Sequence, residues 1–142
     1  MKLTDILVTP LRRIENAGGD VLHGMKQSDV GYTGFGEAYF SWVSAGAIKA
    51  WKRHTQMTMN VVVPVGQVRF VFCCVNADGI EEFRVEEIGV DRFFRITVPP
   101  GIWFGFQGLL TPQSLLLNIA NIPHDPNEIE RLALNNINYD WN

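Results

Sequence analysis

The residue types best suited to chemistry lie in the segment Ile48–His54, where a lysine and a histidine stand two positions apart. Successive side chains of a strand point to opposite faces, so Lys52 and His54 share one face while Trp51 and Arg53 point the other way. An imidazole can take a proton from a carbon next to a ketone, and an ammonium can stabilise the resulting enolate. We therefore predict that Lys52 and His54 are catalytic. The alternative is that Lys52 lies on a solvated rim and His54 is a hydrogen-bonded core residue.

Further groups around this segment complete a candidate site. Tyr39 precedes it in a neighbouring apolar run, which makes it the best placed phenol to serve as a general acid. The basic cluster Lys49–Arg53 suits an anionic small ligand. The aromatic rings could stack on a nucleotide base or a sugar, although core packing is an alternative for each ring. We predict ligand binding for Lys49, Trp51, Arg53, Trp103 and Phe104.

The elements that must position these residues are predicted to be β-strands. Apolar, aromatic and β-branched runs recur along the chain and are separated by Gly, Pro and Asn-Asp turn signals. Such closely spaced strands favour a sandwich or barrel over alternating strands and helices. The runs are Ala38–Val43, Ile48–His54, Asn60–Pro64, Val68–Val75, Ile80–Ile88, Phe93–Val98, Ile102–Phe106 and Ser114–Ile122.

Two regions fall outside this strand pattern. Residues 15–35 are Gly-rich and polar, which predicts a long loop or a strand-poor arm. Near the end of the chain, Asp125 is a candidate helix cap, Pro126 suits the first helical position, and the acidic Glu128 and Glu130 favour the first turn. We expect one short C-terminal helix there, which turns three apolar residues inward: Ile129, Leu132 and Leu134.

Size and composition restrict the possible classes. The 142 residues predict a single domain, 1–142, with a net charge of −3 and no basic run that would track nucleic-acid phosphates. No apolar stretch is long enough for a membrane helix, so no membrane partner is expected. Cys73 and Cys74 are adjacent in a strand and point to opposite faces, which predicts reduced thiols and a cytoplasmic location.

The spacing of two motifs matches a metal-binding β-barrel, the cupin. Gly46 and Gly66 bound the first motif, and Pro99 and Gly101 begin the second. The four slots for metal ligands hold Lys52, His54, Met59 and Phe104. A single imidazole does not make a transition-metal site, so we predict no metal.

Three segments closely resemble the nucleotide-sugar 3,5-epimerase family, typified by dTDP-4-dehydrorhamnose 3,5-epimerase, and above all its short relatives. They read FGEAYFSWVSAGAIKAWKRHTQMTMNVVVPVG, VPPGIWFGFQG and NIPHDPNEIERLALNNINYDW. The resemblance extends from about Leu7 to Trp141. It implies an all-β fold, the double-stranded β-helix or cupin jelly roll. It also implies a homodimer, a nucleoside diphosphate sugar as ligand, and no metal or organic cofactor.

Position by position, the resemblance also assigns roles. The catalytic-base His of the family falls on Lys52, and its enolate-stabilising Lys falls on Met59, which we add to the ligand-binding residues. Its acid Tyr falls near Leu116 or Leu117. Its base-orienting Asp lies beyond Asn142. The short relatives usually read Trp-His-x-His here, so His54 is the remaining member of that pair.

The resulting expectation is cofactor-free epimerisation or isomerisation of a nucleotide-linked 4-keto-6-deoxy sugar, in deoxysugar or surface-polysaccharide biosynthesis. An alternative is a catalytically degenerate cupin that binds a nucleotide sugar or serves as an accessory protein. A metal-dependent cupin, such as a dioxygenase, is the third reading. Solvent deuterium uptake, ligand calorimetry and metal analysis distinguish the three.

Overall fold

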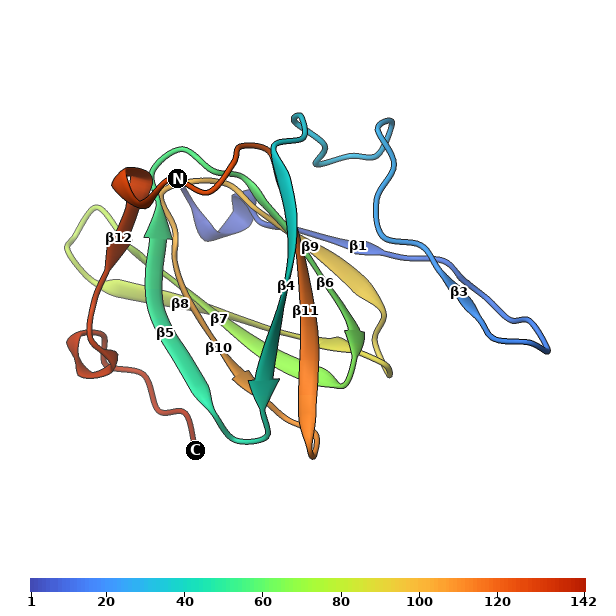
Figure 1. Cartoon of the computed structure of the whole chain (residues 1–142). Coiled ribbons are helices and arrows are strands. Elements are labelled where there is room, and N and C mark those ends of the chain that lie inside the picture. The colour runs from blue at the N-terminus through green and yellow to red at the C-terminus, as the bar shows by residue number, and fades with distance from the viewer.

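Two antiparallel five-stranded sheets face each other in the computed structural model, which describes residues 1–142 (Figure 1). This arrangement confirms the predicted all-β jelly roll. The first sheet has the order β1 (Leu7–Pro10), β9 (Phe94–Val98), β6 (Met59–Val65), β11 (Gln113–Ala120) and β4 (Glu37–Ser44). The second has the order β12 (Ile129–Arg131), β5 (Ile48–His54), β10 (Trp103–Gly108), β7 (Gln67–Val75) and β8 (Glu81–Gly89).

The Gly-rich arm forms a hairpin. Its short strands β2 (Arg13–Ile14) and β3 (Val21–Leu22) pair with each other and with no other strand. The hairpin projects well away from the two sheets (Figure 1). The prediction of a strand-poor arm therefore holds for most of residues 15–35, with β3 as its one strand.

The predicted C-terminal helix is wrong. Asp125 does accept a hydrogen bond from the backbone N–H of Asn127, but only a 3₁₀ turn, η2 (Pro126–Glu128), follows. The chain then becomes extended because β12 pairs with β5, with Ile129 opposite His54, and so covers the edge of that strand. Leu132 and Leu134 are exposed rather than turned inward. Two further 3₁₀ turns, η1 (Leu3–Asp5) and η3 (Leu134–Asn136), lie near the termini.

Apolar side chains form two separate clusters. The larger one lies between the sheets and includes Val63, Phe72 and Ile96. The smaller one lies on the outer face of the second sheet, where the C-terminal segment packs Trp141 against Trp51 with ring centroids 5.5 Å apart. Trp51 therefore points away from the interior of the barrel, as the alternation along its strand predicts.

The two cysteines follow the same alternation. Cys73 belongs to the outer cluster and Cys74 packs against the inner one, and both thiols are free. Burial raises the pKa of Cys73 to about 11, so this thiol is protonated at neutral pH. The structure contains no helix that is long and apolar enough to cross a membrane.

Candidate functional site

A cavity of about 80 Å³ opens between the two sheets. Three of its lining residues are the predicted catalytic set, Tyr39, Lys52 and His54. Tyr39 comes from the first sheet, whereas Lys52 and His54 come from the second. The remaining walls are mostly apolar or aromatic and consist of Ser41, Met59, Val61, Phe70, Phe104, Phe106, Leu116 and Asn118. We call this space the inner cavity.

An outer groove of about 420 Å³ adjoins the inner cavity, and the two share Ser41, Lys52, Phe104 and Phe106. Lys49 and Arg131 also line this groove, which therefore gathers three cationic side chains. Arg131 is the cross-strand partner of Lys52, so these two side chains stand next to each other. A groove of this charge suits an anionic group on the ligand.

A bulge in β5 explains why both lysines of that strand line the groove. Against β10, Lys52 is opposite Phe104 and Lys49 is opposite Phe106, although the lysines are three positions apart and the phenylalanines only two. The register shift between Phe104 and Gly105 accounts for the extra residue. Glycine suits this place, because a Cβ on Gly105 would lie only 2.5 Å from the Cβ of Ala50.

His54 forms a buried pair with Glu128. Its Nδ1 lies 2.6 Å from Oε2 of Glu128, and the two side chains are 4% and 1% exposed. The other carboxylate oxygen accepts hydrogen bonds from the backbone N–H groups of Gln56 and Met57, at 3.1 and 2.9 Å. The carboxylate thus fixes the ring by holding a proton on Nδ1.

The two members of this pair have lowered pKa values for different reasons. Burial lowers the pKa of His54 and outweighs the opposite effect of Glu128. Burial acts to raise the pKa of Glu128, but hydrogen bonds from His54, Met57 and Gln56 outweigh it and lower that pKa. Glu128 is therefore ionised and His54 neutral at pH 7.

This state leaves a free basic nitrogen on His54. Its Nε2 makes no hydrogen bond within the protein and is not fully buried, so a bound molecule can reach it. Because the His54 ring lines the inner cavity, Nε2 can accept a proton from a bound molecule.

Tyr39 offers a proton on the other side of the cavity. Its hydroxyl oxygen accepts a hydrogen bond from Nδ2 of Asn118 at 2.9 Å, so its own O–H proton is not used in that bond. Burial raises the pKa of Tyr39, which keeps the phenol protonated. A base on one sheet and an acid on the other can act on opposite faces of one ligand.

Two of the predicted ligand-binding residues lie elsewhere. Arg53 donates to Glu130 at 2.9 Å and stacks over the ring of Trp103 at 4.6 Å. Neither Arg53 nor Trp103 lines the cavity or the groove, because both point to the outer face of their sheet. We no longer propose them as ligand contacts. Of the other predicted residues, Met59 and Phe104 line the cavity, and Lys49, Trp51 and Phe104 line the groove.

Sequence reasoning missed Glu128, Asn118, Ser41 and Arg131. Glu128 was expected to favour a helix start, and the resemblance placed the base-orienting acid beyond Asn142. In the structure the carboxylate that contacts His54 is that of Glu128, 74 residues away in the chain. An acidic residue at the end of a capped proline turn was the one available signal, and it does not identify a distant partner.

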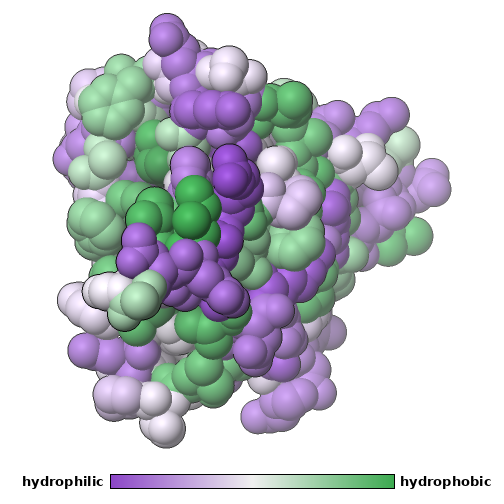
Figure 2. Space-filling view, turned by 90° about the vertical axis from the view of Figure 1, so that its right-hand side faces the viewer, coloured by the Kyte–Doolittle hydropathy of each residue, from purple (hydrophilic) through white to green (hydrophobic).

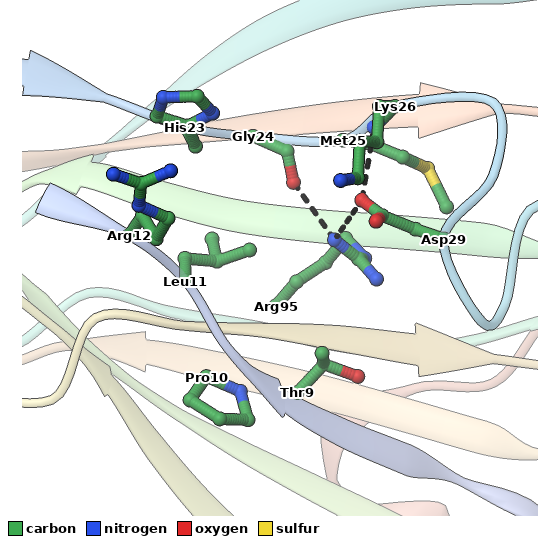
Figure 3. Close-up of a pocket in the computed structure, with 10 residues that line it drawn as sticks. All are labelled: Thr9, Pro10, Leu11, Arg12, His23, Gly24, Met25, Lys26, Asp29 and Arg95. Atoms are coloured by element: carbon green, nitrogen blue, oxygen red, sulfur yellow. Dashed lines mark hydrogen bonds and ion pairs between the residues drawn. The ribbon is translucent and has the colours of Figure 1, made fainter.

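A third hollow, of about 240 Å³, lies outside the barrel between β1 and the segment after β3 (Figure 3). Arg95 is fully buried beneath it and donates to the carbonyl oxygens of Gly24 and Val30 at 2.9 and 3.0 Å. Asp29 lies 3.4 Å from the same guanidinium. These contacts fasten the 24–30 segment to the sheet, so we assign Arg95 a structural role.

Neither a protein-family model nor a curated protein matches the chain. Among solved structures, a dTDP-sugar isomerase from Desulfovibrio desulfuricans G20 is 32% identical, with a TM-score of 0.89 over 96% of this chain and 90% of that one. A dTDP-4-dehydrorhamnose 3,5-epimerase from Bacillus anthracis, with TDP and pyrophosphate bound, is 18% identical, with a TM-score of 0.79 over 95% and 82%. A sugar 3,4-ketoisomerase from Thermoanaerobacterium thermosaccharolyticum, in complex with TDP, is 14% identical, with a TM-score of 0.76 over 92% and 90%. The last two share the fold.

Proposed function

The chain belongs to the dTDP-sugar isomerase family, and on this basis we propose that it epimerises or isomerises a nucleotide-linked 4-keto-6-deoxy sugar without a cofactor. The pathway would be deoxysugar or surface-polysaccharide biosynthesis. The observation that carries the proposal is the pairing of His54 with Glu128 opposite Tyr39 in one cavity. A neutral imidazole and a protonated phenol on opposite walls are what proton removal and return require.

The two adjoining hollows suit the two parts of such a ligand. The inner cavity has apolar walls with a few polar groups, which fits the keto sugar. The outer groove has Lys49, Lys52 and Arg131, which fit the negative charge of a diphosphate. Two structures of the same fold hold TDP, which supports a nucleoside diphosphate as the anionic part.

The proposed reaction moves one proton at a time. Nε2 of His54 takes the proton from a carbon next to the ketone, and the electrons of that bond move to the keto oxygen. A positive charge at Lys52 favours the resulting enolate. Tyr39 then returns a proton to the other face, and solvent restores both side chains to their starting states.

The direct test uses dTDP-4-keto-6-deoxyglucose in D₂O, followed by NMR spectroscopy. We expect replacement of hydrogen by deuterium at a carbon next to the ketone, together with a new epimer or isomer. Tight binding of dTDP by calorimetry without exchange or product would contradict the enzyme proposal and support a binding protein instead.

Glu128 is proposed to position the base. Replacing Glu128 with Gln should lower the exchange rate about 10²-fold, since the neutral amide no longer holds the ring and the backbone N–H groups equally well. The fall in rate at acid pH should also move to lower pH, because the carboxylate that raises the pKa of His54 is gone. Glu130→Gln, which alters only the exposed pair with Arg53, is the matched control.

A homodimer is part of the proposal. On the outer face of the first sheet, Phe40 and Trp42 are 64% and 50% exposed, and each lies directly opposite a leucine of β11. Val65 continues this apolar strip beside Leu115. Figure 2, a view onto the right-hand side of Figure 1, shows several apolar patches among polar side chains. A continuous exposed strip of this kind favours contact with a second copy.

The strip gives a simple prediction. The double change Phe40→Glu and Trp42→Glu should convert the dimer to a monomer, as measured by light scattering after size exclusion. Val75→Glu, at a residue that is exposed on β7, should leave the dimer intact. A wild-type protein that is monomeric at every concentration would contradict this part of the proposal.

The cytoplasm is the proposed location. Cys73 and Cys74 are both free. As adjacent residues of one strand they point to opposite faces, which favours two separate reduced thiols over a disulfide. A reducing compartment keeps them so.

A further inference from the structure

Lys52 lines both the inner cavity and the outer groove, and its amino group has no partner within the protein. No hydrogen bond or ion pair is formed by this group, whereas Nζ of Lys49 donates to the carbonyl oxygen of Trp42 at 2.8 Å. The walls beside Lys52 include the rings of Phe104 and Phe106, which offer no hydrogen-bond acceptor. An ammonium here loses hydrogen bonds to water, and the protein does not replace them, so the charged form is disfavoured.

Neighbouring charges add to this effect. Arg131 faces Lys52 across the strand pair, and the bulge brings Lys49 to the same side. Burial first, and then Arg131 and Lys49, lower the pKa of Lys52. Glu128 acts on the pKa of Lys52 in the opposite direction, but its carboxylate is already engaged by His54 and two backbone N–H groups. A larger share of Lys52 is therefore a free amine, which is the nucleophilic form.

We propose that the amine of Lys52 bonds covalently to the keto carbon of the sugar, so that the reaction runs through an enamine. This inference rests on the proposed function, because the ketone of the ligand is the group attacked. It replaces the enolate beside a charged Lys52 with an enamine on the neutral amine of Lys52. The nitrogen lone pair forms the C–N bond as the C=O π bond breaks, giving a carbinolamine. With one proton from solvent the hydroxyl leaves as water, and an iminium remains. No oxidant or reductant is needed.

His54 acts in the next step. Its Nε2 removes the proton from the carbon beside the iminium, and the C–H electrons form a C=C bond as the C=N electrons return to nitrogen. Reprotonation of that carbon on the other face restores the iminium, and water then releases the ketone and the amine. The surroundings that disfavour a positive charge on Lys52 also favour discharge of the iminium to the neutral enamine, so they assist C–H cleavage.

Reductive trapping tests this step. The protein is incubated with dTDP-4-keto-6-deoxyglucose and cyanoborohydride, and its intact mass is measured. We expect one adduct per chain, with the mass of the sugar nucleotide less one oxygen atom, and peptide mapping should place it on Lys52. Lys52→Arg keeps the charge but should abolish the adduct and lower deuterium exchange at least about 10²-fold. Lys26→Arg, at an exposed residue outside both hollows, should change neither.

The outcomes separate this inference from the proposed function. Deuterium exchange without an adduct, or full exchange in Lys52→Arg, would overturn the covalent step and leave the enzyme proposal standing. Absence of both exchange and adduct would overturn the enzyme proposal and the covalent step with it. An adduct on Lys52 that disappears in Lys52→Arg supports the covalent step. Circular dichroism confirms that the variant is folded.

Discussion

Replacing His54 with asparagine should slow solvent deuterium exchange into dTDP-4-keto-6-deoxyglucose at least about 10³-fold. Asparagine can still donate a hydrogen bond to Glu128 from its side-chain amide, so the buried carboxylate keeps a partner. It has no nitrogen that accepts a proton near neutral pH. The rate of mass increase of the sugar nucleotide in D₂O measures the loss.

The control for this change is His23→Asn. His23 is exposed and lies in the third hollow, away from the inner cavity, so its replacement should leave exchange unaltered. If His54→Asn exchanged deuterium as fast as the wild type, another group would be the base and the proposed reaction would be wrong.

The pH dependence follows from the same pair. Because the pKa of His54 lies below its usual 6.5, exchange should be constant near neutrality and fall only at more acid pH. Folding responds in the same direction. Both His54 and Glu128 bind protons less readily when folded than when unfolded, so the free energy of unfolding should decrease as the pH falls below about 6.5. Urea unfolding at a series of pH values measures this, and a stability that rose on acidification would contradict the assignment.

Gly66→Ala should cost about 3–5 kcal/mol of stability, from left-handed backbone strain together with overpacking. Gly66 has φ of +86°, and a Cβ there would clash with Oγ of Ser114 and lie 2.8 Å from its Cα. Ser114 cannot move away cheaply, because its hydroxyl accepts from the N–H of Gln67 at 3.0 Å. Urea unfolding measures the loss.

Gly46→Ala is the matched control at the other end of the first motif. Gly46 has φ of +80°, but no atom lies within 4 Å of the Cβ position. Its replacement should therefore cost only the backbone strain, about 1–2 kcal/mol. Equal losses at the two glycines would show that the contact with Ser114 does not matter.

The strand that carries the site could be predicted from the sequence to the residue. Ile48–His54 was expected to be extended and is β5, and the expected alternation does turn Lys52 and His54 inward and Trp51 outward. Local side-chain patterning determines these features. Tyr39 also reached the cavity as expected, because β4 pairs with β11 with its alternate residues facing inward.

The remaining features depend on contacts between distant segments. The bulge that aligns Lys49 with Lys52 is visible only when β5 is paired with β10. The turn after Asp125 has the sequence of a helix start, yet the chain continues as β12 and pairs with β5. Glu128 joins His54 only through that pairing, which no local pattern contains.

The pairing of β12 with β5 has a consequence for how the protein matures. Glu128 and Arg131 reach the site from a segment that is synthesised well after the strand that carries Lys52 and His54. A nascent polypeptide that stops before residue 128 would have an imidazole without its orienting acid. Proton transfer would then become fast only after this later segment docks, so a half-made barrel on the ribosome would act on sugar nucleotides only slowly.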